Sequence, residues 1–178
     1  MAKSKPFFIE AIQFVPVITL ASSFLVAGGV DLGRAAPLFV VSAAMAVIIT
    51  VGLAAKQVLL NPILLGSNLW LFVGAIAFGL PVPPLADFIA FAEAAGLFGA
   101  ILVVGIGYFV ARSKTGFIGL PGGDAKVVRN LSIVLLALTA LALGWSIVFL
   151  DNIRLAGGLP FILLNVTRRV LIRRSRRR

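Results

Sequence analysis

Glu93 is the residue whose type and position most favour chemistry, because it lies inside a long apolar run at residues 86–111. A carboxyl in hydrocarbon is costly and normally faces the interior of a helix bundle or water. Such a group can exchange a proton or bind a cation, so Glu93 is a candidate ion site, with Asn68 and Ser67 of the preceding apolar run as its candidate partners. The alternative is a structural carboxyl, bonded across a helix interface or hydrated near the membrane surface.

Small residues accompany Glu93 at helical spacing. Positions three, four or seven residues apart share one face of a helix, and small side chains let a neighbouring helix approach closely. We therefore expect a helix-packing face that also contains the carboxylate, formed by Ala92, Gly96, Ala100 and Gly107. Such a face can pack within one chain, between two copies of it, or against another membrane-protein subunit, so the sequence leaves these partners open.

The residue inventory excludes several kinds of chemistry. The 178 residues contain no cysteine and no histidine, which rules out disulfides, thiolate nucleophiles, haem ligation through imidazole and ordinary zinc sites. The acidic residues are scattered, and metal-dependent chemistry would need Asp31, Asp87 and Asp151 to converge. We therefore expect no enzyme activity, no cofactor and no metal site.

The composition predicts a membrane protein. Hydrophobic residues make up 61% of the chain and charged residues only 12%, against about half and about a quarter in soluble domains. Because roughly 20 apolar residues make a helix that crosses the hydrocarbon core, we expect an all-α integral membrane protein, with residues 1–167 forming a single domain of six transmembrane helices. The expected spans are about 11–30, 36–54, 59–80, 86–111, 129–150 and 155–171, the last one short.

Charge sets the expected topology, because short loops that are rich in lysine and arginine are retained on the cytoplasmic side of the membrane. Six spans with the N-terminus inside place all but Arg34 and Arg154 of the 16 basic residues on that side. Five spans, the alternative, would place an arginine-rich C-terminus outside. We therefore expect both termini in the cytoplasm and a multi-pass protein of the bacterial inner membrane. The first run is longer than a signal-peptide core, so we expect it to stay uncleaved.

Residues 168–178 are expected to form a basic cytoplasmic tail. Basic clusters beside a membrane attract anionic lipid by about 1 kcal/mol per residue. No aromatic residues alternate with the arginines, so we expect no binding of nucleic acid. The expected anionic-lipid contacts are Arg168, Arg169, Arg173, Arg174, Arg176, Arg177 and Arg178.

Two classes of function follow from these features. The scarcity of other polar groups within the spans favours a non-catalytic envelope scaffold, assembly partner or subunit of a membrane complex. The alternative is a small transporter, channel or substrate-binding membrane subunit in which Glu93 binds a proton or cation. It is favoured by the interior carboxyl and by three prolines that can break helices, Pro16, Pro62 and Pro160.

Two resemblances accord with these classes. The size and six-span count resemble the substrate-capture subunits of energy-coupling-factor vitamin transporters, a resemblance of architecture without a shared motif. The Phe14-Val15-Pro16 segment and the basic connection at residues 112–128 are similar to the intracellular septation protein A family, whose aromatic and lysine signatures this chain lacks. Within that connection, Gly119–Asp124 has turn chemistry and lacks the spacing of a phosphate-binding loop.

Overall fold

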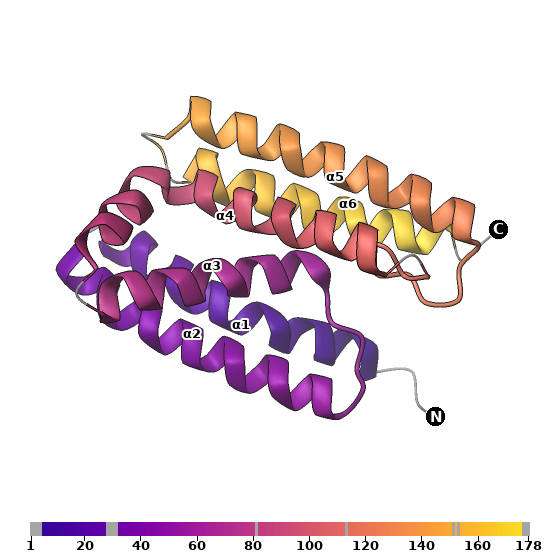
Figure 1. The fold of residues 1–178 in the computed structure, drawn as a ribbon, viewed down its shortest axis with the longest axis horizontal. Coiled ribbons are helices and arrows are strands. Elements are labelled where there is room, and N and C mark those ends of the chain that lie inside the picture. The colour runs from indigo at the N-terminus through magenta and orange to yellow at the C-terminus, as the bar shows by residue number, and fades with distance from the viewer. Residues whose placement is uncertain are drawn as a thin grey trace. The chain divides into compact units, whose positions relative to one another are not determined.

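The computed structural model describes residues 5–27, 32–80, 82–112, 114–150, 152 and 154–175. The side chains of residues 5–8, 10, 23–27, 32–35 and 93 lie outside this description. The described residues are all-helical (Figure 1). They form α1 (Lys5–Ala27), α2 (Leu32–Ala55), α3 (Pro62–Gly79), α4 (Pro83–Ala111), α5 (Ala125–Val148), the π-helical turn η1 (Arg154–Gly158) and α6 (Leu159–Ser175).

Five stretches of the described helices are long and apolar enough to cross a membrane. They are Ala36–Ala55, Pro62–Gly79, Ala94–Ala111, Ala125–Val148 and Arg154–Ser175. This is the architecture of a multi-pass membrane protein. The segment expected to be a short last span is a helical stretch of 22 residues, whereas α1 contributes a shorter apolar stretch, Ala11–Ser22, among the residues searched. The count of six spans and the side of the termini stay predictions.

Two helix starts follow directly from local sequence. Proline has no backbone N–H to lose and is favoured in the first turn, and α3 begins at Pro62, where the Asn61 side chain accepts from the backbone N–H of Ile63 at 3.1 Å. Asp124 caps α5 in the same way, because its carboxylate accepts from the backbone N–H groups of Lys126 and Val127 at 2.8 and 3.1 Å. These caps satisfy donors that the first turn leaves without intrahelical partners.

The helices group into two compact units, Met1–Phe91 and Ala92–Arg178. In the first unit α2 and α3 run side by side (Figure 1). Gly74 permits their close approach, because a Cβ at this position would collide with the ring of Phe39. The Phe39 ring also packs against Phe78, with centroids 5.3 Å apart. The core of this unit is therefore the contact between α2 and α3.

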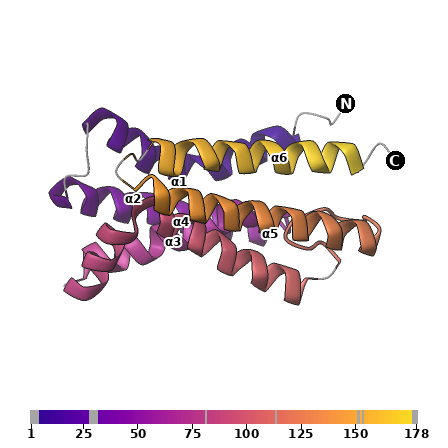
Figure 2. The same cartoon turned by 90° about the horizontal axis from the view of Figure 1, so that it is seen from above.

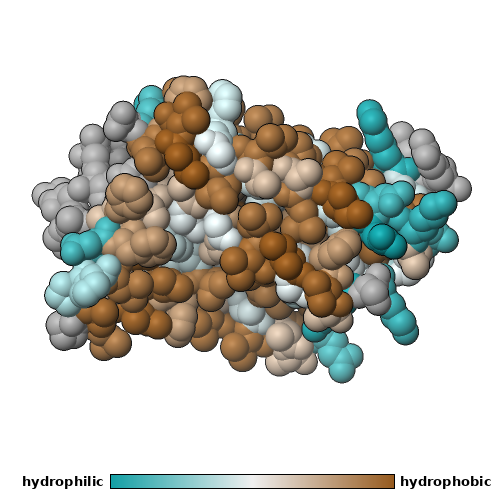
Figure 3. Space-filling model, turned by 45° about the horizontal axis from the view of Figure 1, so that its top comes forward, coloured by the Kyte–Doolittle hydropathy of each residue, from teal (hydrophilic) through white to brown (hydrophobic). Residues whose placement is uncertain are grey.

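In the second unit α5 and α6 lie side by side (Figure 2). The residues of α5 that are buried are spaced alternately four and three apart, which is the spacing of a coiled-coil seam. They are Val128, Ser132, Leu135, Thr139, Ala142 and Ser146. The remaining surface of the helix includes exposed leucine, isoleucine and valine side chains. On the face drawn in Figure 3, hydrophobic side chains cover the middle of the helices and hydrophilic side chains gather toward their ends.

Candidate functional site

Glu93 lies in the interior of α4, as the sequence predicts, and its side chain is outside the part that the structure describes. Its pairing with Asn68 or Ser67 therefore stays a prediction. Ser67 is fully buried on α3, and its hydroxyl donates to the carbonyl oxygen of Ile63, one turn earlier, at 3.0 Å. The Ser67 hydroxyl thus satisfies its donor within its own helix.

Asn68 joins α3 to α2. Its Nδ2 donates to the Thr50 hydroxyl oxygen at 3.1 Å, while its Oδ1 is buried without a hydrogen-bond partner among the described residues. The hydroxyl of Ser42, fully buried on α2, is likewise unpaired within the described part of the chain. Buried polar atoms are normally bonded, so these two atoms mark where the first unit can accept a further hydrogen-bond partner. Thr50 and Ser42 were not predicted from the sequence, where their only signal is a hydroxyl inside an apolar run.

Gln13 ties α1 to the start of α3. Its Oε1 accepts from the backbone N–H of Asn61 at 2.9 Å, and its Nε2 donates to the Ile9 carbonyl at 3.3 Å. Both Gln13 and Asn61 are buried. The Asn61 N–H lies at the N-terminal end of α3, where no intrahelical carbonyl is in reach. The glutamine therefore completes the cap of α3 from another helix.

The four residues of the expected packing face on α4 differ in burial. Ala92 and Ala100 are buried, Gly96 is half-buried, and Gly107 is exposed with no atom within 4 Å of where its Cβ would lie. Close approach to α5 occurs instead at Gly105, whose Cβ would lie 2.9 Å from Leu136 and 3.0 Å from Phe117. The role of the four small residues as one packing face stays a prediction.

The connection between α4 and α5 folds back onto the second unit. Phe117, Ile118 and Leu120 are buried, and Gly116 and Gly119 adopt positive φ values of 56° and 67°. Side chains of α5 and α6 both form hydrogen bonds with the backbone of one residue in the middle of this loop, Ile118. The N–H of Ile118 donates to the Ser132 hydroxyl of α5 at 3.2 Å, and its carbonyl oxygen accepts from Arg168 of α6.

The Arg168 contact is the clearest one that the sequence analysis did not foresee. Its Nε donates to the Ile118 carbonyl at 3.0 Å, and the residue is only 6% exposed. Moreover, α6 continues through the start of the expected tail to Ser175. The arginines up to Arg174 therefore belong to a helix, and the first of them is part of the packing of the second unit.

Other basic residues flank this loop in the sequence or follow Arg168 on α6 within two turns. The exposed ones among the described residues are Arg112, Lys114, Lys126, Arg129, Arg173 and Arg174. Arg169 is half-buried, and the guanidinium of Arg112 lies 5.5 Å from the centroid of the Tyr108 ring. Arg176, Arg177 and Arg178 lie outside the described residues. This end of the unit is therefore strongly cationic, which suits an anionic surface.

Metal ligation finds no support in the described part of the chain, which holds no group of three or more acidic side chains. Asp31 and Asp151, two of the aspartates whose convergence would be needed, lie outside it, and Asp87 is exposed.

No protein-family model matches the chain, and neither a curated protein nor a solved structure matches it significantly. The two resemblances drawn from the sequence therefore depend on chain size and span count, and on the Phe14-Val15-Pro16 segment with the basic connection, alone.

Proposed function

We propose that the chain is a six-span protein of the bacterial inner membrane, with both termini in the cytoplasm, that acts without catalysis as an envelope scaffold, assembly partner or subunit of a membrane complex. The observation that carries the proposal is the connection between α4 and α5. The side chains of Ser132 and Arg168 bond to the backbone of Ile118 in this connection. This network uses polar groups to hold a fixed surface. A preformed surface lowers the ordering cost of docking a partner subunit.

The other buried hydroxyls of α5 support the same interpretation. Thr139 donates to the carbonyl of Leu135 at 2.8 Å, and Ser146 donates to the carbonyl of Ala156 in η1. A pathway for a polar solute needs groups that exchange partners with that solute, whereas these hydroxyls are bonded to backbone carbonyls of the second unit. Ser146 thereby joins α5 to η1, whereas Thr139 satisfies its donor within α5.

The scaffold proposal is tested in two measurements. The protein is extracted from native membranes in copolymer nanodiscs, and we expect native mass spectrometry to show partner subunits at a fixed stoichiometry. Purified protein in liposomes, assayed with a pH-sensitive dye under imposed proton, sodium and potassium gradients, should give no flux above empty liposomes. Two results together would overturn the scaffold proposal and favour transport. They are flux above that of empty liposomes, and nanodiscs that contain this chain without partner subunits.

A second candidate function is transport of a proton or cation through Glu93. It is favoured by the position of Glu93 inside the apolar helix α4, because a carboxyl at membrane depth normally faces the interior of a helix bundle or water. In the same liposomes, Glu93→Gln should then abolish flux. Asp87→Asn is the matched control, since it neutralises an exposed carboxyl of the same helix. Flux as large as that of the wild type in both variants would show that Glu93 is not part of the pathway.

A further inference from the structure

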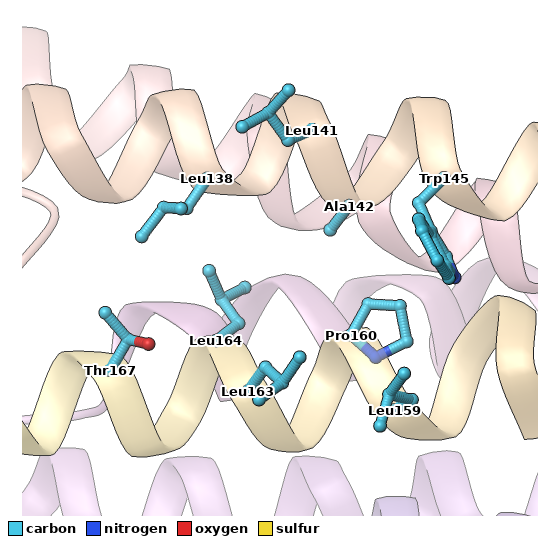
Figure 4. A pocket seen from close by; sticks show the side chains of 9 residues that line it. All are labelled: Leu138, Leu141, Ala142, Trp145, Leu159, Pro160, Leu163, Leu164 and Thr167. Carbon is cyan, nitrogen blue, oxygen red and sulfur yellow. The ribbon is translucent and has the colours of Figure 1, made fainter.

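An apolar groove lies between α5 and α6 in the second unit (Figure 4). It has a volume of about 220 Å³ and is lined by residues within the stretches Leu138–Trp145 and Leu159–Thr167. Its rim is open, because Leu141 is 69% exposed and Leu163 is 56% exposed. Both helices are long and apolar enough to cross a membrane, so the open side of the groove suits an apolar occupant.

The groove is preformed by the packing around it. Ala142 is buried and contributes only a methyl group between Leu138 and Trp145, which leaves the space unfilled. The indole of Trp145 is fixed as a wall, since its Nε1 donates to the carbonyl of Leu155 at 3.0 Å and its ring packs against Phe149 with centroids 4.5 Å apart. A fixed wall lowers the ordering cost of binding.

One end of the groove leads toward an exposed arginine. Thr167, the lining residue nearest the C-terminus, and Arg174 are seven residues apart on α6 and therefore share one face of the helix. At 1.5 Å per residue, Arg174 lies about 10 Å beyond the groove along the helix. Arg173 is also exposed, but it points about 100° away from Arg174 around the helix. Residues 159–178 contain no acidic side chain, so no carboxylate on this segment competes for the guanidinium.

We propose that this groove binds one acyl chain of an anionic phospholipid from the surrounding bilayer, whose phosphate is bound by Arg174. The apolar groove accounts for the chain and the arginine for the preference for an anionic headgroup, and their spacing along α6 joins the two into one site. The proposal rests on the expected attraction of the arginine cluster for anionic lipid, and adds a defined place and register to it.

The site is tested by native mass spectrometry of the whole protein, titrated in detergent with phosphatidylglycerol and with phosphatidylcholine of the same acyl chains. We expect wild-type protein to retain one phosphatidylglycerol in preference to phosphatidylcholine. Arg174→Gln should lower that preference about fivefold, whereas Arg173→Gln, with the same change of charge, should leave it. Ala142→Leu, which fills the groove, should remove the retained lipid, whereas Ala140→Leu on an exposed position of α5 should not.

Any of the following results would contradict the proposed site. Equal losses in Arg173→Gln and Arg174→Gln would leave a diffuse attraction of the basic cluster for lipid and no groove site. A change of oligomeric state in Ala142→Leu without loss of lipid would make the groove a contact between copies. Because Ala142 is buried, Leu163→Phe fills the groove from its exposed rim and repeats the test, and lipid retention by a folded Leu163→Phe protein would contradict the proposal.

Discussion

The Nε of Arg168 donates to the backbone carbonyl of Ile118 at 3.0 Å, across 50 residues of sequence. The other backbone group of Ile118, its N–H, donates to the Ser132 hydroxyl at 3.2 Å. One loop residue is thus bound by side chains of both α5 and α6. A buried loop needs partners for its peptide groups, and these two helices supply them for Ile118.

Replacing Arg168 should therefore destabilise the protein. Arg168→Ala leaves the Ile118 carbonyl buried without this donor, and an unpaired buried group costs about 1–3 kcal/mol. We expect a loss of that size in the free energy of unfolding, measured by denaturant titration in mixed micelles. Arg173→Ala is the control, because Arg173 is exposed. Equal effects of the two substitutions would show that the Arg168 contact adds no stability.

Two glycines of the loop separate backbone strain from steric collision. Gly116 and Gly122 both have positive φ, 56° and 69°, which costs a non-glycine residue about 1–2 kcal/mol. A Cβ at Gly116 would also meet the Ser132 hydroxyl and lie 2.9 Å from Val128, whereas the space around Gly122 is open.

Gly116→Ala should therefore lower the midpoint of thermal unfolding more than Gly122→Ala does. The difference between the two variants reports the collision alone, because the cost of positive φ is common to both. Similar shifts in the two variants would mean that the loop moves away from α5 at little cost.

The membrane helices were predictable from the sequence because their apolar runs are long, but the faces that pack were not. In a soluble helix the apolar stripe marks the buried face, whereas on α5 exposed positions such as Leu141 and Ile147 are as apolar as the buried ones. The buried seam is marked instead by small and hydroxylated residues, Ser132, Thr139 and Ser146 among them. Their spacing of seven is visible in the sequence and is the signal that the sequence analysis overlooked.

The candidate site was predictable only in part. The placement of Glu93 within a helix follows from the length of its apolar run, and Asn68 was recognised as polar inside another. The bond from Asn68 to Thr50 was not, because it depends on the register between α2 and α3, which Gly74 and Phe39 help to set through their close contact. Register between helices is a property of packing and has no local sequence signal.

The bond between Asn68 and Thr50 should contribute measurably to stability. Hydrogen bonds between membrane helices contribute about 0.6 kcal/mol on average and up to about 1.7 kcal/mol. A double-mutant cycle with Asn68→Leu and Thr50→Val should give a coupling energy in this range, from unfolding in mixed micelles. A coupling energy of zero, with both single variants folded, would show that the two side chains do not stabilise each other.

The number of crossings can be measured directly, because the natural chain has no cysteine and single cysteines can be placed at will. With six spans and a cytoplasmic N-terminus, the connection before α6 lies outside and the end of α6 inside. Asn152→Cys should then react with a membrane-impermeant maleimide on intact spheroplasts, whereas Lys126→Cys and Arg173→Cys should react only after the membrane is permeabilised. All three positions are exposed on the described structure, so burial does not protect them.

Arg173→Cys distinguishes the two topologies. Because a charged residue at the centre of a bilayer is costly, α6 crosses only if Arg168 and Arg169 lie near the cytoplasmic surface, as its exposed C-terminal arginines favour. Labelling of both Asn152→Cys and Arg173→Cys from outside would mean that α6 does not cross and that the chain has five spans. It would also place Arg174 on the outer side, where the proposed lipid site would have to draw its phospholipid from the outer leaflet.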